Sequence, residues 1–175
     1  KLIETVAKGT RNKCLIVDAT GEYSEIDSNA TSIKIGTGEF RFNYANLSID
    51  ELYFLLKPSS KVQVPKLMEA IRSLKISRLD TSNQLSMYYN VDASGQIIRK
   101  IINKSNKPKL SFNQFYYRNV QFIEDNNCNF DFTLLPFQLT NECIWDNGDN
   151  WGGQNNTDLG NCISLISRVN NIMST

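Results

Sequence analysis

The chain has 175 residues, of which 41% are hydrophobic and 21% are charged, and its formal net charge is +1 at neutral pH. This composition excludes a disordered tail, and no apolar run approaches the roughly 18 residues that a membrane-spanning helix needs. Because the charge is almost balanced, any binding of nucleic acid must depend on a local basic patch rather than on the field of the whole chain.

The first predicted element is the end of a helix. Leu2, Ile3 and Val6 recur at helical spacing, and Gly9, a residue type that commonly ends a helix, follows three residues after Val6. The helical spacing starts at once, and the first residue, Lys1, is not a methionine. We therefore expect a piece of a longer protein that starts inside a helix.

An uninterrupted apolar run at residues 14–17 follows and ends at Asp18. A strand that is covered on both faces needs such a run, so the pattern predicts a strand of a parallel α/β sheet. A short buried strand of an antiparallel sandwich is the alternative. Residues 32–36 and 39–43 then alternate polar and apolar side chains around a Thr-Gly pair, which predicts a hairpin.

A helix is predicted to begin at residue 48. Ser48 and Glu51 have the spacing of a capping box, in which each side chain accepts a hydrogen bond from the backbone N–H of the other residue. This helix should end near Lys57, because Pro58 cannot continue it.

A second helix is predicted to begin between residues 60 and 65. Leu67, Ile71 and Leu74 lie on one face of it, which should be buried. Its basic side chains should point away from that face, and they are Lys66, Arg72, Lys75 and Arg78. These side chains, like a second basic group within residues 99–109, could contact the phosphate backbone of DNA. The alternative is a solvated surface that only keeps the protein soluble.

From residue 47 onward the sequence predicts a mainly helical segment. Further helices are expected at residues 97–102, 112–123, 136–144 and 158–173, and a solvated loop rich in asparagine and glycine is expected at 146–156. Aromatic residues at helical spacing should belong to the core, and they are Phe112, Phe115, Tyr116 and Phe122. Other aromatic residues are candidates for a surface that faces a partner, and they are Tyr53, Phe54, Trp145 and Trp151.

The residues that follow the apolar run are the clearest candidates for chemistry. Asp18 and Glu22 stand at the carboxyl end of the predicted strand, and Gly21 lets the chain turn sharply between them. Ligands of open α/β sheets bind beyond the carboxyl ends of the strands. An acid there can face a nucleotide, its magnesium ion or the attacking water, and the alternative is a strand end followed by a polar turn.

The segment CLIVDATGEYSEI, residues 14–26, resembles a strand with the pattern D-P-x-G-E-Y in HerA-type ATPases. These ATPases are hexameric DNA translocases of the HerA–FtsK branch of the P-loop NTPases. KLIETVAKGTRNK is similar to the end of the helix that precedes this strand in the family, and ANLSIDELYFLL is similar to the start of a helical insertion. The resemblance implies an α/β fold with a partial RecA-like P-loop core at residues 1–46, followed by a mainly helical insertion at 47–175.

The chain also departs from the family. Ala19 stands where the family usually has proline, no G-x-x-x-x-G-K-[ST] loop precedes the strand, and no apolar strand that ends in Asp-Glu follows it. Without these two motifs there is neither a cradle for the phosphates nor an acid to organise the metal and water. We therefore expect an internal fragment of the ATPase that cannot hydrolyse ATP alone.

The resemblance implies a parent protein that is an ATP-driven DNA translocase or helicase. Such a protein works as a homo-oligomeric ring, such as a hexamer, with ATP and magnesium as cofactors and DNA as partner. Asp18 would lie near the bound phosphate, and Glu22 would lie beside it at the subunit boundary. The alternative is a non-catalytic helical module that docks a partner nuclease, another effector or a neighbouring subunit.

The cysteines favour a reducing compartment. None of them forms a CxxC pair, and the chain has no histidine that could complete a zinc site. Reduced thiols in the cytoplasm are therefore expected, rather than a framework of disulfides. The four cysteines are Cys14, Cys128, Cys143 and Cys162.

Overall fold

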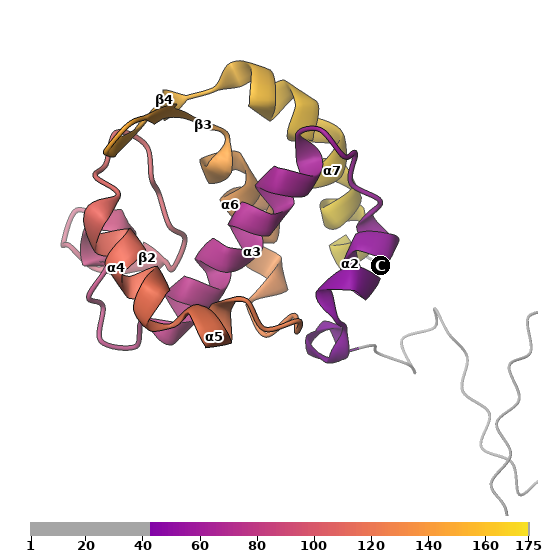
Figure 1. Ribbon diagram of the computed structural model, residues 1–175, viewed down its shortest axis with the longest axis horizontal. Helices are drawn as coiled ribbons and strands as arrows, with labels where there is room; N and C mark the ends of the chain where they lie inside the picture. The colour runs from indigo at the N-terminus through magenta and orange to yellow at the C-terminus, as the bar shows by residue number, and fades with distance from the viewer. Residues whose placement is uncertain (1–42, 175) are drawn as a thin grey trace, which may run out of the picture. The chain divides into compact units, whose positions relative to one another are not determined.

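The computed structural model describes residues 43–174, and Figure 1 shows how this part of the chain is arranged. The helix end, the apolar strand and the hairpin that the sequence predicts before residue 43 lie outside the described residues. Asp18 and Glu22 lie there too, so their roles stay predictions.

Helices dominate the described residues. Three short 3-10 helices and two antiparallel hairpins connect them, so the fold is a mixed α/β arrangement in which helices predominate. The helices are α2 (Ile49–Leu56), α3 (Gln63–Leu79), α4 (Leu110–Arg118), α5 (Val120–Ile123), α6 (Leu135–Glu142) and α7 (Asn156–Ser174). The 3-10 helices are η1 (Tyr44–Asn46), η2 (Ser86–Tyr88) and η3 (Phe132–Leu134). The strands are β1 (Asn90–Val91), β2 (Ile97–Arg99), β3 (Ile144–Asn147) and β4 (Asn150–Gln154).

The predicted start and end of α2 are confirmed. The Ser48 hydroxyl accepts a hydrogen bond from the Glu51 N–H at 3.2 Å, and the Glu51 carboxylate accepts one from the Ser48 N–H at 2.8 Å. Lys57 then adopts the left-handed conformation, with φ 45°, and its N–H donates to the Tyr53 carbonyl. The capping box therefore satisfies backbone donors that the first turn leaves unpaired.

Helix α3 crosses the centre of this unit and lies against α5, α6 and α7 (Figure 1). Its predicted apolar face is confirmed, because Leu67, Ile71 and Leu74 are all buried. The prediction that its basic side chains all point to solvent is wrong for Lys75, which is only 2% exposed. The reason is that α3 has neighbours on more than one side, so that its second face is also covered.

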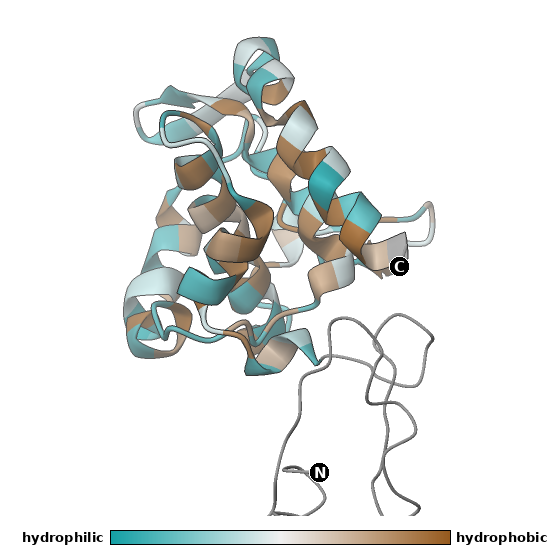
Figure 2. Cartoon of the chain, turned by 90° about the vertical axis from the view of Figure 1, so that its right-hand side faces the viewer, coloured by the Kyte–Doolittle hydropathy of each residue, from teal (hydrophilic) through white to brown (hydrophobic). Residues whose placement is uncertain are grey.

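Two apolar clusters form the core. The first joins α2, α3, α6 and α7 through Leu52, Leu67, Leu135 and Leu165, among others. The second gathers around Tyr88 and includes residues of α3, α4 and α5. Figure 2 shows the consequence on the helices, along which hydrophobic and hydrophilic residues alternate as amphipathic packing requires.

The helix predicted at residues 97–102 is wrong. Residues 97–99 form β2, which pairs antiparallel with β1. Two β-branched residues, Ile97 and Ile98, favour an extended backbone. Gly95 has φ +83° in the turn before them, which few residues other than glycine adopt. The turn and the β-branched pair thus make a hairpin where apolar spacing alone indicates a helix.

The helix predicted at 112–123 is present but broken. Asn119 ends α4, and the short helix α5 follows it. The break changes which side chains face the core: Phe112 and Phe115 are buried as predicted, whereas Phe122 is 57% exposed. The helices predicted at 136–144 and 158–173 are confirmed as α6 and α7 to within two residues at each end.

The solvated loop predicted at residues 146–156 is wrong for most of its length. Strands β3 and β4 form a hairpin there, with Asn147 paired to Asn150 across a two-residue turn. Gly148 has φ +63° in that turn, as the tight turns of hairpins require. The Asn-Gly-Asp-Asn sequence therefore marks a hairpin turn rather than an irregular loop.

The sequence predicts reduced cysteines and contains no apolar run long enough to span a membrane. Cys128, Cys143 and Cys162 are buried free thiols, and Cys14 lies outside the described residues. Within residues 43–174, no helix is both long and apolar enough to cross a membrane.

Candidate functional site

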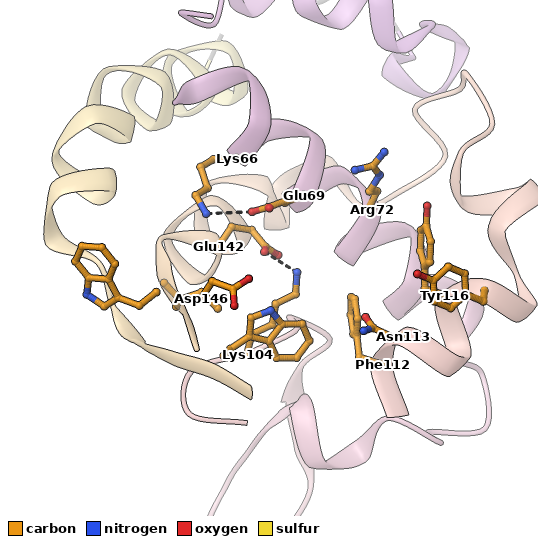
Figure 3. A pocket seen from close by; sticks show the side chains of 13 residues that line it. Lys66, Glu69, Arg72, Lys104, Phe112, Asn113, Tyr116, Glu142 and Asp146 are labelled. Atoms are coloured by element: carbon orange, nitrogen blue, oxygen red, sulfur yellow. Dashed lines mark hydrogen bonds and ion pairs between the residues drawn. The ribbon is translucent and has the colours of Figure 1, made fainter. Parts of the chain in front are cut away.

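A pocket of about 350 Å³ opens between α3, α4 and the β3–β4 hairpin (Figure 3). Five of its lining side chains are aromatic: Phe112, Tyr116, Tyr117, Trp145 and Trp151. Six are charged: Lys66, Glu69, Arg72, Lys104, Glu142 and Asp146. The pocket is therefore aromatic and carries charges of both signs.

A buried ion pair forms part of the pocket lining. The Lys104 Nζ lies 2.6 Å from the Glu142 Oε2, and the two residues are 5% and 1% exposed. The other oxygen of Glu142 accepts hydrogen bonds from the Ser73 hydroxyl at 2.6 Å and from the Gln138 amide at 2.7 Å. Three donors from three parts of the chain therefore satisfy a carboxylate that would otherwise be costly to bury.

The Lys104 ammonium also faces two aromatic rings. It lies 4.7 Å from the centre of the Phe112 ring and 5.2 Å from that of Trp151. These two rings meet edge to face, with centres 5.1 Å apart. The cation and the rings attract each other, so that the ion pair also holds the aromatic wall of the pocket in place.

Gln138 ties the segment before Lys104 to helix α6. Its side-chain oxygen accepts from the Ile102 N–H and its side-chain amide donates to the Ile102 carbonyl, both at 2.9 Å. This pair of bonds satisfies buried backbone groups that have no strand partner at that point. It also brings Lys104, two residues on, within reach of Glu142.

Ion pairs continue to the rim. Lys66 on α3 lies 3.1 Å from Glu69 and 3.8 Å from Asp158 on α7. Burial lowers the pKa of Lys66, but the carboxylates of Glu69, Asp158 and Glu142 together outweigh burial and raise it above its ordinary value. On the hairpin, a 2.7 Å hydrogen bond from Lys109 holds the pKa of Asp146 below its ordinary value.

Arg72 lies at the edge of the pocket and binds Glu124 with two parallel hydrogen bonds. Its Nε and Nη2 donate to the two carboxylate oxygens at 2.6 and 2.9 Å. The Tyr116 hydroxyl donates to the same carboxylate at 2.7 Å. These bonds, with that from Arg72 the strongest, lower the pKa of Glu124.

The structure brings together only part of the basic set predicted to contact DNA. Lys66 and Arg72 line the pocket, where both are paired with carboxylates. Lys75 lies elsewhere, and its ammonium donates to the backbone carbonyls of Ile123 and Asp125. Arg78 is exposed near the end of α3. DNA contact through these residues stays a prediction.

Sequence reasoning missed the centre of the site. Lys104 stands in the second basic group, where its sequence neighbours suggest a surface, and Glu142 attracts no attention as a single acid. One signal was present: Gln138 and Glu142 are four residues apart and therefore share the face of α6 that also carries the buried Leu135 and Leu139. Polar residues on an otherwise buried face predict a buried polar network.

The sequence predicts four aromatic candidates for a surface that faces a partner: Tyr53, Phe54, Trp145 and Trp151. Trp145 is 56% exposed at the pocket and Phe54 is 79% exposed on α2. Trp151 instead packs against Phe112 and Tyr88 inside the pocket wall.

No protein family, no curated protein and no solved structure matches the chain. Residues 43–174 also hold no group of three or more side chains that could bind a metal ion.

Proposed function

We propose that the chain is part of an ATP-driven DNA translocase of HerA type, and that residues 43–174 are a non-catalytic helical module that docks a partner protein. The translocase class is supported by the resemblance of residues 14–26 to the D-P-x-G-E-Y strand. In the complete protein, ATP and magnesium would bind within a cytoplasmic homo-oligomeric ring, such as a hexamer, that moves along DNA. Asp18 would lie beside the phosphates and Glu22 beside the next subunit.

The docking role depends on one observation: the pocket exposes aromatic rings, whereas its basic groups are paired. Tyr117 is 72% exposed and Trp145 is 56% exposed. Lys66, by contrast, has a side chain only 15% exposed, between two carboxylates. DNA binding requires basic groups that can reach phosphates, whereas tyrosine and tryptophan are enriched where proteins bind one another. The partner would be a nuclease, another effector or a neighbouring subunit.

The translocase proposal is tested on the complete protein by measuring ATP hydrolysis with and without DNA. We expect DNA to stimulate hydrolysis, and we expect Asp18→Asn to lower the rate about 100-fold, the scale of a lost acid or base. Asp131→Asn is the control, because Asp131 only caps η3 and an asparagine can cap it equally well. The proposal would be contradicted if the protein bound no ATP, or if Asp18→Asn left the rate of ATP hydrolysis unchanged.

The docking proposal is tested by placing a photo-crosslinking amino acid at position 117 of the protein in its own cells. We expect an adduct that protease removes and nuclease does not. The same amino acid at position 98, which is 62% exposed on β2 and does not line the pocket, is the control and should give no such adduct. A nuclease-sensitive adduct at position 117, or no adduct, would overturn the docking role.

A further inference from the structure

The ion pairs at the pocket and around its rim contain five carboxylates and four basic groups. Lys66 forms ion pairs with both Glu69 and Asp158, whereas each of the other basic residues pairs with one acid. The four basic members are Lys66, Arg72, Lys104 and Lys109. The five acidic members are Glu69, Glu124, Glu142, Asp146 and Asp158. This set of ion pairs therefore has a formal charge of −1, whereas the six charged side chains that line the pocket itself balance.

In two of these pairs, the acid is much more exposed than the base. The Asp146 side chain is 79% exposed and that of Glu69 is 44% exposed, while their partners Lys109 and Lys66 are 18% and 15% exposed. The charge of Lys66 also lowers the pKa of Asp146, so the Lys66–Glu69 and Lys109–Asp146 pairs interact electrostatically. In Figure 3, the carboxylates of Glu69 and Asp146 lie at the same pocket. In these two pairs, the carboxylate is therefore more exposed to an approaching molecule than the ammonium group that it pairs with.

Two exposed rings stand at the same pocket. Trp145 and Tyr117 line it and are both more than half exposed. Lys104 occupies the faces of Phe112 and Trp151, but among the described residues no cation lies over the ring of Trp145 or Tyr117. The face of an aromatic ring attracts cations, most strongly on tryptophan.

We propose that the pocket receives an arginine side chain of the partner protein, with its guanidinium against Trp145 and its charge matched by Asp146 and Glu69. A guanidinium is planar, so it can stack on a ring while it donates hydrogen bonds to carboxylates in its own plane. The ammonium of lysine is compact and strongly hydrated, and fits such a place less well. The inference rests on the proposed docking function and adds the chemistry of the partner.

The test uses the indole N–H signals in a ¹H–¹⁵N NMR spectrum of the chain. The chain has two tryptophans, so Trp145→Phe assigns both signals. The probe is N-acetyl-L-arginine methylamide, and its citrulline analogue has the same shape without the charge. We expect arginine to shift the Trp145 signal with saturation, and citrulline to bind about five-fold more weakly, the scale of one exposed cation–π or ion-pair contact. The lysine analogue should bind between the two.

The double variant Glu69→Gln/Asp146→Asn should weaken arginine binding about five-fold, because it removes both exposed carboxylates. Asp131→Asn removes an exposed carboxylate that does not line the pocket and should leave binding unchanged. Thermal unfolding of each variant checks that it is folded. Equal binding of citrulline, unchanged binding by the double variant, or a Trp145 signal that does not move would each overturn the inference.

The two proposals fail separately. A protein adduct at position 117 together with no preference for arginine would overturn only the arginine inference. A nucleic-acid adduct at position 117 would overturn the docking function as well.

Discussion

At the scale of single residues, the pocket depends on a buried carboxylate and the groups that donate to it. Glu142 is 1% exposed, and Lys104, Ser73 and Gln138 all donate to it. A buried ion pair of this kind adds little net stability over apolar residues, but it is costly to break on one side. Its donors come from α3, from α6 and from the segment before α4, so the carboxylate links three segments around the pocket.

Lys104→Met should therefore lower the free energy of unfolding by about 3–5 kcal/mol, because Glu142 keeps its burial and loses its counter-charge. Urea unfolding followed by circular dichroism measures this. Lys61→Met, at an exposed position, should cost almost nothing. Adding Glu142→Leu to Lys104→Met should restore part of the loss, and a single-variant loss below about 1 kcal/mol would show that the pair is not buried.

The Arg72–Glu124 pair should make the free energy of unfolding depend on pH below neutrality. The pKa of Glu124 in the folded protein lies below its ordinary value of 4.5. Its contribution is therefore fully present above pH 4.5 and is lost as the pH falls through the lowered value. Arg72→Met should cost about 0.5–1 kcal/mol at pH 7, since both side chains are about one-third exposed.

Urea unfolding of wild type and Arg72→Met between pH 7 and pH 3 checks this expectation. The difference between their free energies of unfolding should become smaller as the pH falls toward 3. A difference that stays constant with pH would mean that Arg72 stabilises the protein through packing rather than through the charge of Glu124.

At the scale of elements, the β3–β4 hairpin determines where Trp145 points. Ile144 pairs with Gln154 and Asp146 with Trp151, so that Trp145 stands opposite two residues of β4. One of them, Gly152, lies so close that an added Cβ would be 2.9 Å from the Cβ of Trp145. The irregular pairing thus requires a glycine beside the tryptophan.

Gly152→Ala should therefore destabilise the protein by about 1–3 kcal/mol, the usual cost of overpacking, and should change the fluorescence of Trp145. Gly160→Ala is the matched control. A Cβ there would meet nothing within 4 Å, and alanine suits the middle of α7 better than glycine, so this variant should gain about 0.5–1 kcal/mol. Equal effects of the two variants would contradict the close contact.

At the scale of the whole described unit, α3 joins the two core clusters. Leu67, Ile71 and Leu74 belong to the first cluster and Ile76 belongs to the second. One rigid helix that contributes to both clusters should couple their unfolding.

We therefore expect tryptophan fluorescence and far-ultraviolet circular dichroism to give the same unfolding midpoint in urea. Both tryptophans, Trp145 and Trp151, lie at the pocket, and Trp151 packs against the second cluster, whereas the helices extend over both clusters. A fluorescence midpoint at a lower urea concentration than the circular dichroism midpoint would mean that the second cluster unfolds before the first. Ile76→Ala should lower both midpoints together, since it removes about 2–5 kcal/mol of packing.

Local structure could be predicted from the sequence wherever the signal lies within a few residues. The capping box of Ser48 and Glu51, the apolar face of α3 and the extents of α6 and α7 follow from spacing along the chain, because a helix forms its hydrogen bonds within four residues. The β1–β2 hairpin was missed because apolar spacing over a few residues does not separate strand from helix. The β3–β4 hairpin was missed because its asparagine and glycine residues are also typical of a solvated loop.

The roles of the basic residues and the position of the pocket could not be predicted, because both depend on contacts between distant parts of the chain. Lys104 and Glu142 are 38 residues apart, and nothing in the spacing of either predicts the pair. Helical spacing shows that Lys75 and Leu74 point in different directions, but it does not show that α5 and the residues after it cover the side of α3 on which Lys75 lies. The charges of a helix become a surface or a buried network according to what packs on them, and that depends on contacts between distant parts of the chain.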